Sequence, residues 1–259
     1  MRSIWEQAHI LRLSLHNKGN WNNNGRGQNG GNKKGKGKGA GKPGKGKGGK
    51  GKGGKGKGKG TVALPEMRQG RIALCFTTVF ALCTTGRTIP HFDFDSPTQS
   101  YAIARAQLSY YEALQREGHV RIVTSIDQLK SHMKDWTHWD SGPAGNPAPP
   151  PPLGLVISME SADALMDPDQ LEEWYNAGLR LLGPSHSGEG RYAGGTGSDT
   201  GLTALGPPLL QEMQRLGIPL DLTHTSDRAF WECLDHYEGL AFASHANSRV
   251  LVPHQRQRN

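Results

Sequence analysis

The feature that most constrains the fold of this chain is a regular alternation of short apolar segments and amphipathic segments between residues 153 and 245. The apolar segments are typical of buried strands, and the segments between them have helical spacing. Strands alternating with helices of about 10–15 residues indicate parallel βαβ units. The expected strands are 153–160, 179–186, 218–224 and 240–245, and the expected helices are 168–178, 202–217 and 226–237.

A second set of elements is expected before residue 153. Residues 71–82 form a nearly continuous apolar run, which predicts another strand buried on both faces. Helical spacing follows at 100–118, and a short strand and a further helix are expected within 119–136. The proline-rich stretch 140–152 is compatible only with an extended surface loop.

Charge divides the chain into two parts. Residues 1–62 hold 16 Lys and Arg against one acid, Glu6, a charge of +15, whereas residues 63–259 hold 15 against 22 acids, a charge of −7. Residues 25–60 consist almost entirely of Gly, Lys and Asn, so they have too little apolar surface to offset their ordering entropy. We therefore predict a disordered, low-complexity basic region at 1–62 and a folded domain at 63–259.

Two interpretations of the Lys/Gly region remain open. Closely spaced lysines on a flexible chain can bind a polyanion by releasing its counterions. The alternative is a solvated insertion without a partner, which is favoured because no aromatic residues are interleaved with the lysines of 25–60 for base stacking.

The compartment follows from cysteines and hydropathy. Cys75, Cys83 and Cys233 are too few and too scattered for a disulfide framework. No cleavage-site pattern follows the N-terminal apolar stretch, and no run approaches the ~18 apolar residues of a membrane span. The sequence predicts a cytoplasmic protein without a membrane span.

Four consecutive expected strands end on ligand-type residues, namely Glu160, His186, His224 and His245. Taken singly, each has an ordinary explanation, since a histidine at a strand end is more often a hydrogen-bonded structural residue than a ligand. In a (β/α) barrel, however, the carboxyl ends of the strands converge on one point. Neutral imidazoles with a carboxylate form a ligand set suited to zinc.

These segments also carry a resemblance to a known family. GLVISMESAD, GLRLLGPSH, RLGIPLDLTH and SHANSR, in this order, resemble the motifs of the membrane (renal) dipeptidase family. The resemblance covers roughly 63–259 and is strongest over 153–258. It implies an α/β fold of the (β/α)8 metal-dependent-hydrolase type with a two-zinc site, and zinc-dependent hydrolysis of dipeptides.

The resemblance also implies a role for each site residue. Glu160 would bridge both metals, and His224 and His245 would complete one zinc site. His186 would contact the substrate carbonyl as a catalytic and substrate-binding residue. Arg256 would bind the free carboxylate of the substrate, a task suited to a planar bidentate donor.

The sequence departs from the family pattern in its metal ligands. The family's first strand ends in His-x-Asp, which should lie before residue 63, but residues 1–62 contain no Asp. A literal HFD occurs at His91–Asp93, after a loop, and is the weaker alternative for this motif. The chain also ends shortly after Arg256, where the family continues with a catalytic Asp and further strands. We therefore expect an incomplete barrel, at most about one zinc per chain, and very low dipeptidase activity.

Three functions compete on the sequence alone. The first is a zinc dipeptidase, with a dipeptide as substrate and a homodimer as its oligomeric form. The second is an inactive dipeptidase-like fragment whose Lys/Gly arm, residues 25–60, binds nucleic acid or another polyanion. The third is an inactive partner of a complete homologue. Hydrolysis of dipeptides in the presence of zinc would distinguish the first from the others.

Overall fold

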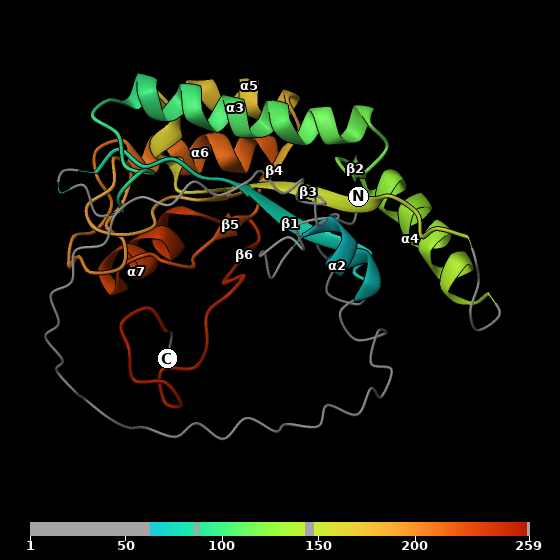
Figure 1. Cartoon of the computed structure of the whole chain (residues 1–259). Coiled ribbons are helices and arrows are strands. Elements are labelled where there is room, and N and C mark those ends of the chain that lie inside the picture. Colours follow the sequence, from blue (N-terminus) through green and yellow to red (C-terminus); the bar gives the residue numbers. More distant parts are fainter. Residues whose placement is uncertain (1–62, 85, 87–88, 143–147, 258–259) are drawn as a thin grey trace, which may run out of the picture. The chain divides into compact units, whose positions relative to one another are not determined.

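The computed structural model describes residues 63–84, 86, 89–142 and 148–257. The predictions on residues 1–62 lie outside this part of the chain and stay predictions. The described residues form an α/β fold (Figure 1). Its elements are, in chain order, α2 (Leu64–Gln69), β1 (Leu74–Val79), α3 (Pro97–Arg116), β2 (Val120–Ile122), α4 (Ile126–Asp140), β3 (Leu153–Glu160), the 3-10 turns η1 (Ala162–Ala164) and η2 (Pro168–Gln170), α5 (Leu171–Asn176), β4 (Leu179–Gly183), α6 (Gly206–Leu216), β5 (Leu220–Asp221), α7 (Asp227–His236) and β6 (Ala241–Phe242).

All strand pairs of the described sheet are parallel, as the sequence predicts. Strands β1, β3, β4, β5 and β6 are neighbours in this order. Strand β2 pairs with the first residues of β3, and β4 pairs with its last residues. Because β1 pairs along the whole of β3, β2 and β4 must share the opposite edge of β3. The parallel order brings the carboxyl ends of five strands to one edge of the sheet.

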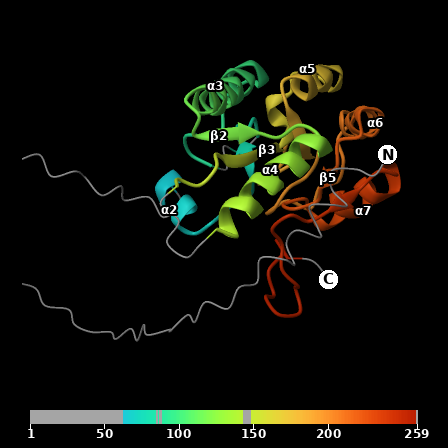
Figure 2. The same cartoon turned by 90° about the vertical axis from the view of Figure 1, so that its right-hand side faces the viewer.

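Helices cover the outer side of the strands. Figure 2 shows α3, α5, α6 and α7 following one another in an arc around the sheet, as expected for part of a (β/α) barrel. Strand β3 is buried along its length except at Glu160. The prediction of a strand buried on both faces at 71–82 is wrong in bounds and burial, because β1 covers only Leu74–Val79, lies at the end of the described strand order and leaves Phe76 exposed. Trp174 of α5 and Leu209 of α6 are fully buried in the same core cluster as β3.

Helix α4 lies at the amino ends of β1 and β3. Ser125 caps it by accepting a hydrogen bond from the backbone N–H of Gln128. His132 of α4 lies 2.7 Å through Nε2 from the carbonyl oxygen of Ala73, and Trp136 donates from Nε1 to the carbonyl of Pro152 at 3.0 Å. The helix therefore satisfies polar backbone groups next to the starts of both strands.

The last two strands are shorter than the sequence predicts. The expected strands 218–224 and 240–245 are observed only as Leu220–Asp221 and Ala241–Phe242. The chain leaves the β5 ladder because the Asp221 carboxylate accepts a hydrogen bond from the N–H of Thr223. His224 then has a positive φ of 71°, which a strand cannot accommodate. The polar residues after these strands thus lie on turns.

Helix α6 also begins later than expected, at Gly206 instead of residue 202. Prolines occupy its first turn, where their missing N–H groups would have no helical partner. Gly217 ends the helix in the left-handed conformation, with φ of 66°. None of the helices in the described part of the chain combines the length and apolar character needed to cross a bilayer.

Candidate metal centre

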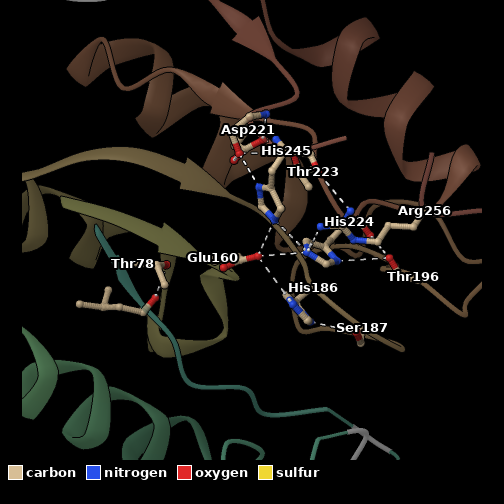
Figure 3. Close-up of polar contacts among 12 residues, drawn as sticks. Thr78, Glu160, His186, Ser187, Thr196, Asp221, Thr223, His224, His245 and Arg256 are labelled. Carbon is tan, nitrogen blue, oxygen red and sulfur yellow. Dashed lines mark hydrogen bonds and ion pairs between the residues drawn. The ribbon is translucent and has the colours of Figure 1, made fainter. Parts of the chain in front are cut away.

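The centre of the site is Glu160, the last residue of β3. Its Oε1 atom lies 3.0 Å from Nε2 of His224, 3.0 Å from Nε2 of His245 and 3.7 Å from Nε2 of His186 (Figure 3). These histidines follow β5, β6 and β4, respectively. The structure thus brings together the four side chains that the sequence places at consecutive strand ends.

Backbone conformation and ring stacking hold two of the histidines. His224 is buried, and its left-handed backbone turns the side chain toward Glu160. Its ring stacks on that of His186, with centroids 3.8 Å apart. The ring of Phe80 packs edge-on against His186 at 4.7 Å, and the hydroxyl of Ser187 lies 2.8 Å from its Nδ1. His186 and His224 are therefore held face to face.

The loop between β4 and α6 supports His186 through its backbone. Thr196 donates its N–H to the carbonyl of His186 at 2.9 Å. A Cβ atom at Gly195 would lie only 2.5 Å from the same carbonyl oxygen, so glycine is needed for this close approach. The loop is also tied to the start of α7, because Ser226 donates its N–H to the carbonyl of Gly194 at 2.8 Å.

Electrostatics keep the carboxylate ionised and one imidazole neutral. Burial opposes ionisation of Glu160, but the imidazoles of His224 and His245 outweigh it, and the pKa of Glu160 lies well below its ordinary value. Burial, followed by the neighbouring His224, lowers the pKa of His186 to about 4. His186 therefore carries no charge at neutral pH.

Arg256 reaches the same cluster from the segment after β6. Its Nη1 donates to the carbonyl of His245 at 3.0 Å, and its Nη2 lies 3.1 Å from Nε2 of His224. An arginine is always a donor and always charged, so Arg256 places a positive charge beside the ring nitrogens that face Glu160. The guanidinium thus lies beside the nitrogen and oxygen atoms that converge on Glu160 (Figure 3).

The donor set fits a metal ion in two overlapping ways. Glu160, His186 and His224 each offer a ligand atom within 4.8 Å of the others. Glu160 Oε1, His224 Nε2 and His245 Nε2 are closer still, within 3.2 Å of one another. Both groups of three share Glu160 and His224. A half-buried carboxylate oxygen surrounded by imidazole nitrogens is an arrangement suited to a cation of the zinc type.

The alternative motif at 91–93 lies in a different environment. His91 is exposed, with a positive φ of 72°. The Asp93 carboxylate accepts hydrogen bonds from the backbone N–H of Thr84, at 2.9 Å, and from the hydroxyl of the same residue. Within the described residues, the group of potential metal ligands does not include this pair.

Sequence reasoning missed the polar residues that support the ligands. Asp221 and Ser244 contact His245 directly or through each other, and Thr196 lies 3.4 Å from Nδ1 of His224. Asp221 and Ser244 each precede a candidate ligand within the quoted motifs RLGIPLDLTH and SHANSR. A polar residue shortly before a candidate ligand, one position for Ser244 and three for Asp221, was the available signal, whereas nothing in the sequence indicates Thr196.

The fold and this Glu–His cluster place the chain in the class of (β/α) metal-dependent-hydrolase barrels. The model of the membrane dipeptidase family, peptidase family M19, matches residues 54–259. The chain belongs to this family, which confirms the resemblance of its motifs.

Solved structures and sequence relatives agree with this family. The dipeptidase AC, an M19 metallopeptidase, superposes with a TM-score of 0.64 at 26% identity over 78% of this chain and 59% of its own. A Rhodobacter sphaeroides metallopeptidase, crystallised with a phosphinate mimic of the dipeptide L-Ala-D-Ala, gives 0.63 at 25% identity over 78% and 61%. An uncharacterized dipeptidase of Schizosaccharomyces pombe is 26% identical over 74% of this chain and 45% of its own length. The chain thus spans less than two thirds of each of these relatives.

Proposed function

We propose that the Glu160 cluster is a zinc site and that it serves the hydrolysis of dipeptides. The observation that carries the proposal is the convergence of three imidazole Nε2 atoms on one carboxylate oxygen. Membership of the membrane dipeptidase family, and the dipeptide mimic bound to the Rhodobacter relative, support the substrate class. Bound zinc would supply Lewis-acid polarisation and a more acidic water molecule.

The metal ligands in this proposal are Glu160, His224 and His245. Their three ligand atoms are the closest group in the cluster. His224 and His245 offer nitrogen, and Glu160 offers a carboxylate whose lowered pKa keeps it ionised over the working pH range. Three protein ligands with a further position open to solvent are typical of a catalytic zinc site. We expect at most about one zinc per chain.

His186 and Arg256 are assigned to the substrate. Because the pKa of His186 is lowered to about 4, its ring is a neutral partner that can donate a hydrogen bond to a peptide carbonyl oxygen. Arg256 offers a planar guanidinium next to the cluster, suited to the free carboxylate of a dipeptide. These two roles would orient the peptide bond relative to the metal site formed by Glu160, His224 and His245.

The experiment measures zinc stoichiometry and dipeptide hydrolysis on the full chain. Metal-free protein is titrated with zinc, the bound metal is measured by elemental analysis, and release of free amino acid is followed for a panel of dipeptides. We expect about one zinc per chain and slow hydrolysis. Glu160→Gln should remove both, whereas Glu66→Gln on the exposed part of α2 should change neither.

Two results would contradict different parts of the proposal. If neither zinc nor another divalent metal binds to the folded chain, the metal site is wrong. If two zincs bind and hydrolysis is fast, the expectation of a single ion is wrong, and the residues at His91 and Asp93 become the next ligands to test by substitution.

A further inference from the structure

A row of polar groups leads from the end of β5 to the ring of His245. The buried Asp221 accepts backbone hydrogen bonds on Oδ1 from Thr223 and Ser244, both at 3.0 Å. Its Oδ2 accepts from the hydroxyl of Ser244 at 2.5 Å. The same hydroxyl oxygen lies 2.7 Å from Nδ1 of His245, whose Nε2 lies 3.0 Å from Glu160 (Figure 3). Asp221, Ser244, His245 and Glu160 thus form a continuous chain of contacts.

The direction of each hydrogen bond in this row follows from its chemistry. A carboxylate is only an acceptor, and a serine hydroxyl has a single hydrogen. At 2.5 Å from Asp221, that hydrogen must lie between the two oxygens, because otherwise their lone pairs would face each other. The Ser244 oxygen can then only accept from His245. Nδ1 of His245 therefore carries a hydrogen, so Nε2 is the ring nitrogen whose lone pair a metal ion would take.

We propose that Asp221, acting through Ser244, is a positioning residue that fixes the tautomer and orientation of His245 for metal binding. The inference rests on the proposed metal function of the Glu160 cluster. A histidine ligand needs the lone pair of the coordinating nitrogen, and a hydrogen bond at the other nitrogen determines which one is free. Asp221 would therefore act on the metal without touching it.

The exposure of His245 explains why such support is needed. Its side chain is 45% exposed, against 8% for His224, so packing restrains it less. It also follows a strand of only two residues. His224, in contrast, is held by stacking on His186 and has a weaker partner at Nδ1, the Thr196 hydroxyl at 3.4 Å. The shorter contacts of the Asp221–Ser244 row compensate for the missing packing around His245.

The test compares Asp221→Asn, Ser244→Ala and the double variant. Zinc affinity is measured by competition with a chromophoric chelator, and we expect each single variant to bind zinc about 10–100-fold more weakly. Both substitutions act on one ring nitrogen through the same contact. The double variant should therefore lose no more zinc affinity than the more strongly affected single variant. A zinc affinity in both single variants equal to that of the unmodified chain would overturn the proposal, as would fully additive losses in the double variant.

A second measurement detects the tautomer itself. Long-range 1H–15N spectra of the metal-free chain distinguish hydrogen on Nδ1 from hydrogen on Nε2. We expect hydrogen on Nδ1 in the unmodified chain and its loss in Asp221→Asn, because the new amide can donate to Ser244 and reverse the row. A His245 ring without hydrogen on Nδ1 in the unmodified chain would overturn the proposal.

A matched control separates this role from stability alone. Ser100 resembles Ser244, since its buried hydroxyl donates to a carbonyl, that of Leu82, at 2.7 Å. Ser100→Ala should lower stability but leave zinc affinity unchanged. A loss of zinc affinity in this control as large as in Ser244→Ala would refute a specific role for the row.

The design also separates this inference from the proposed function. If the unmodified chain binds no zinc, the metal function fails, while the ring signals of His245 still decide whether Asp221 fixes its tautomer. If Asp221→Asn does not fold, Ser244→Ala carries the test, because it preserves both backbone hydrogen bonds to Asp221.

Discussion

A buried histidine lies at each end of the sheet, and the two differ in the polar groups that surround them. At the amino end, His132 of α4 is fully buried, with Nε2 2.7 Å from the carbonyl of Ala73 and, among the described residues, no hydrogen-bond partner for Nδ1. At the carboxyl end, His224 is nearly as buried but contacts a carboxylate, two further histidines and an arginine. Burial is therefore common to both residues, and only convergence with other ligand-type groups distinguishes the site.

The surroundings of each histidine show what each end of the sheet contributes. His132 packs so closely on β3 that a Cβ atom at Gly154 would lie 2.5 Å from its Nε2. Burial lowers its pKa, so the ring is a neutral part of the core. The carboxyl end instead collects partly exposed polar side chains on turns. The amino end thus contributes packing, and the proposed chemistry lies at the carboxyl end, as in barrel enzymes generally.

The largest expected effect tests this division through zinc binding. His224→Ala should abolish measurable zinc binding, because two remaining ligands seldom hold the ion. His132→Ala should leave zinc affinity within about twofold, provided the chain is folded, because it removes no ligand. Isothermal titration on both variants makes the comparison. Equal losses of zinc affinity would show that the two ends are not independent.

The second effect concerns stability. His132→Ala should lower the free energy of unfolding by about 2–4 kcal/mol, because it leaves a cavity and removes one hydrogen-bond partner of the Ala73 carbonyl, which also accepts from the N–H of Gly154. Gly154→Ala should cost about 1–3 kcal/mol by overpacking against His132 and Leu74. In the double variant the smaller residue at 132 makes room for the new methyl group, so the combined loss should be smaller than the sum. Urea denaturation measures all three.

The smallest effect is a dependence of stability on pH. Because burial lowers the pKa of His132, the unfolded chain takes up its proton first as the pH falls below about 6.5. The contribution of the neutral ring to the free energy of unfolding is complete above that pH. As the pH falls toward the lower folded-state pKa, this contribution decreases by at most about 1.4 kcal/mol per pH unit. His132→Gln should therefore show a shallower loss of stability between pH 6.5 and 5 than the unmodified chain. Parallel curves would contradict a buried, neutral His132.

The regular part of the fold could be predicted because its signal is local. The apolar run of β3 and the helical spacing of α3 identify elements without reference to their neighbours. The shortness of β5 and β6 could not be predicted, because it depends on where Asp221 makes its hydrogen bonds. Strand ends in this chain are determined by tertiary contacts, which an apolar pattern does not contain.

The candidate site was predictable to a similar extent. Parallel topology was enough to predict that Glu160, His186, His224 and His245 would meet, whereas their roles as ligands and substrate contacts stay predictions. The sequence did not indicate the face-to-face stacking of His186 on His224 or the row from Asp221 to His245. These contacts depend on backbone turns and rotamers that residue spacing does not determine.

The left-handed backbone of His224 has a consequence for how this position can vary. A residue with a Cβ atom is strained in this left-handed conformation by roughly 1–2 kcal/mol, whereas glycine is not. Glycine would relieve that strain, so selection for backbone stability alone would favour glycine at 224. A histidine at this position therefore indicates that the ring is retained at a cost in backbone stability. If the ring lost its task, this preference for glycine would act on position 224 unopposed.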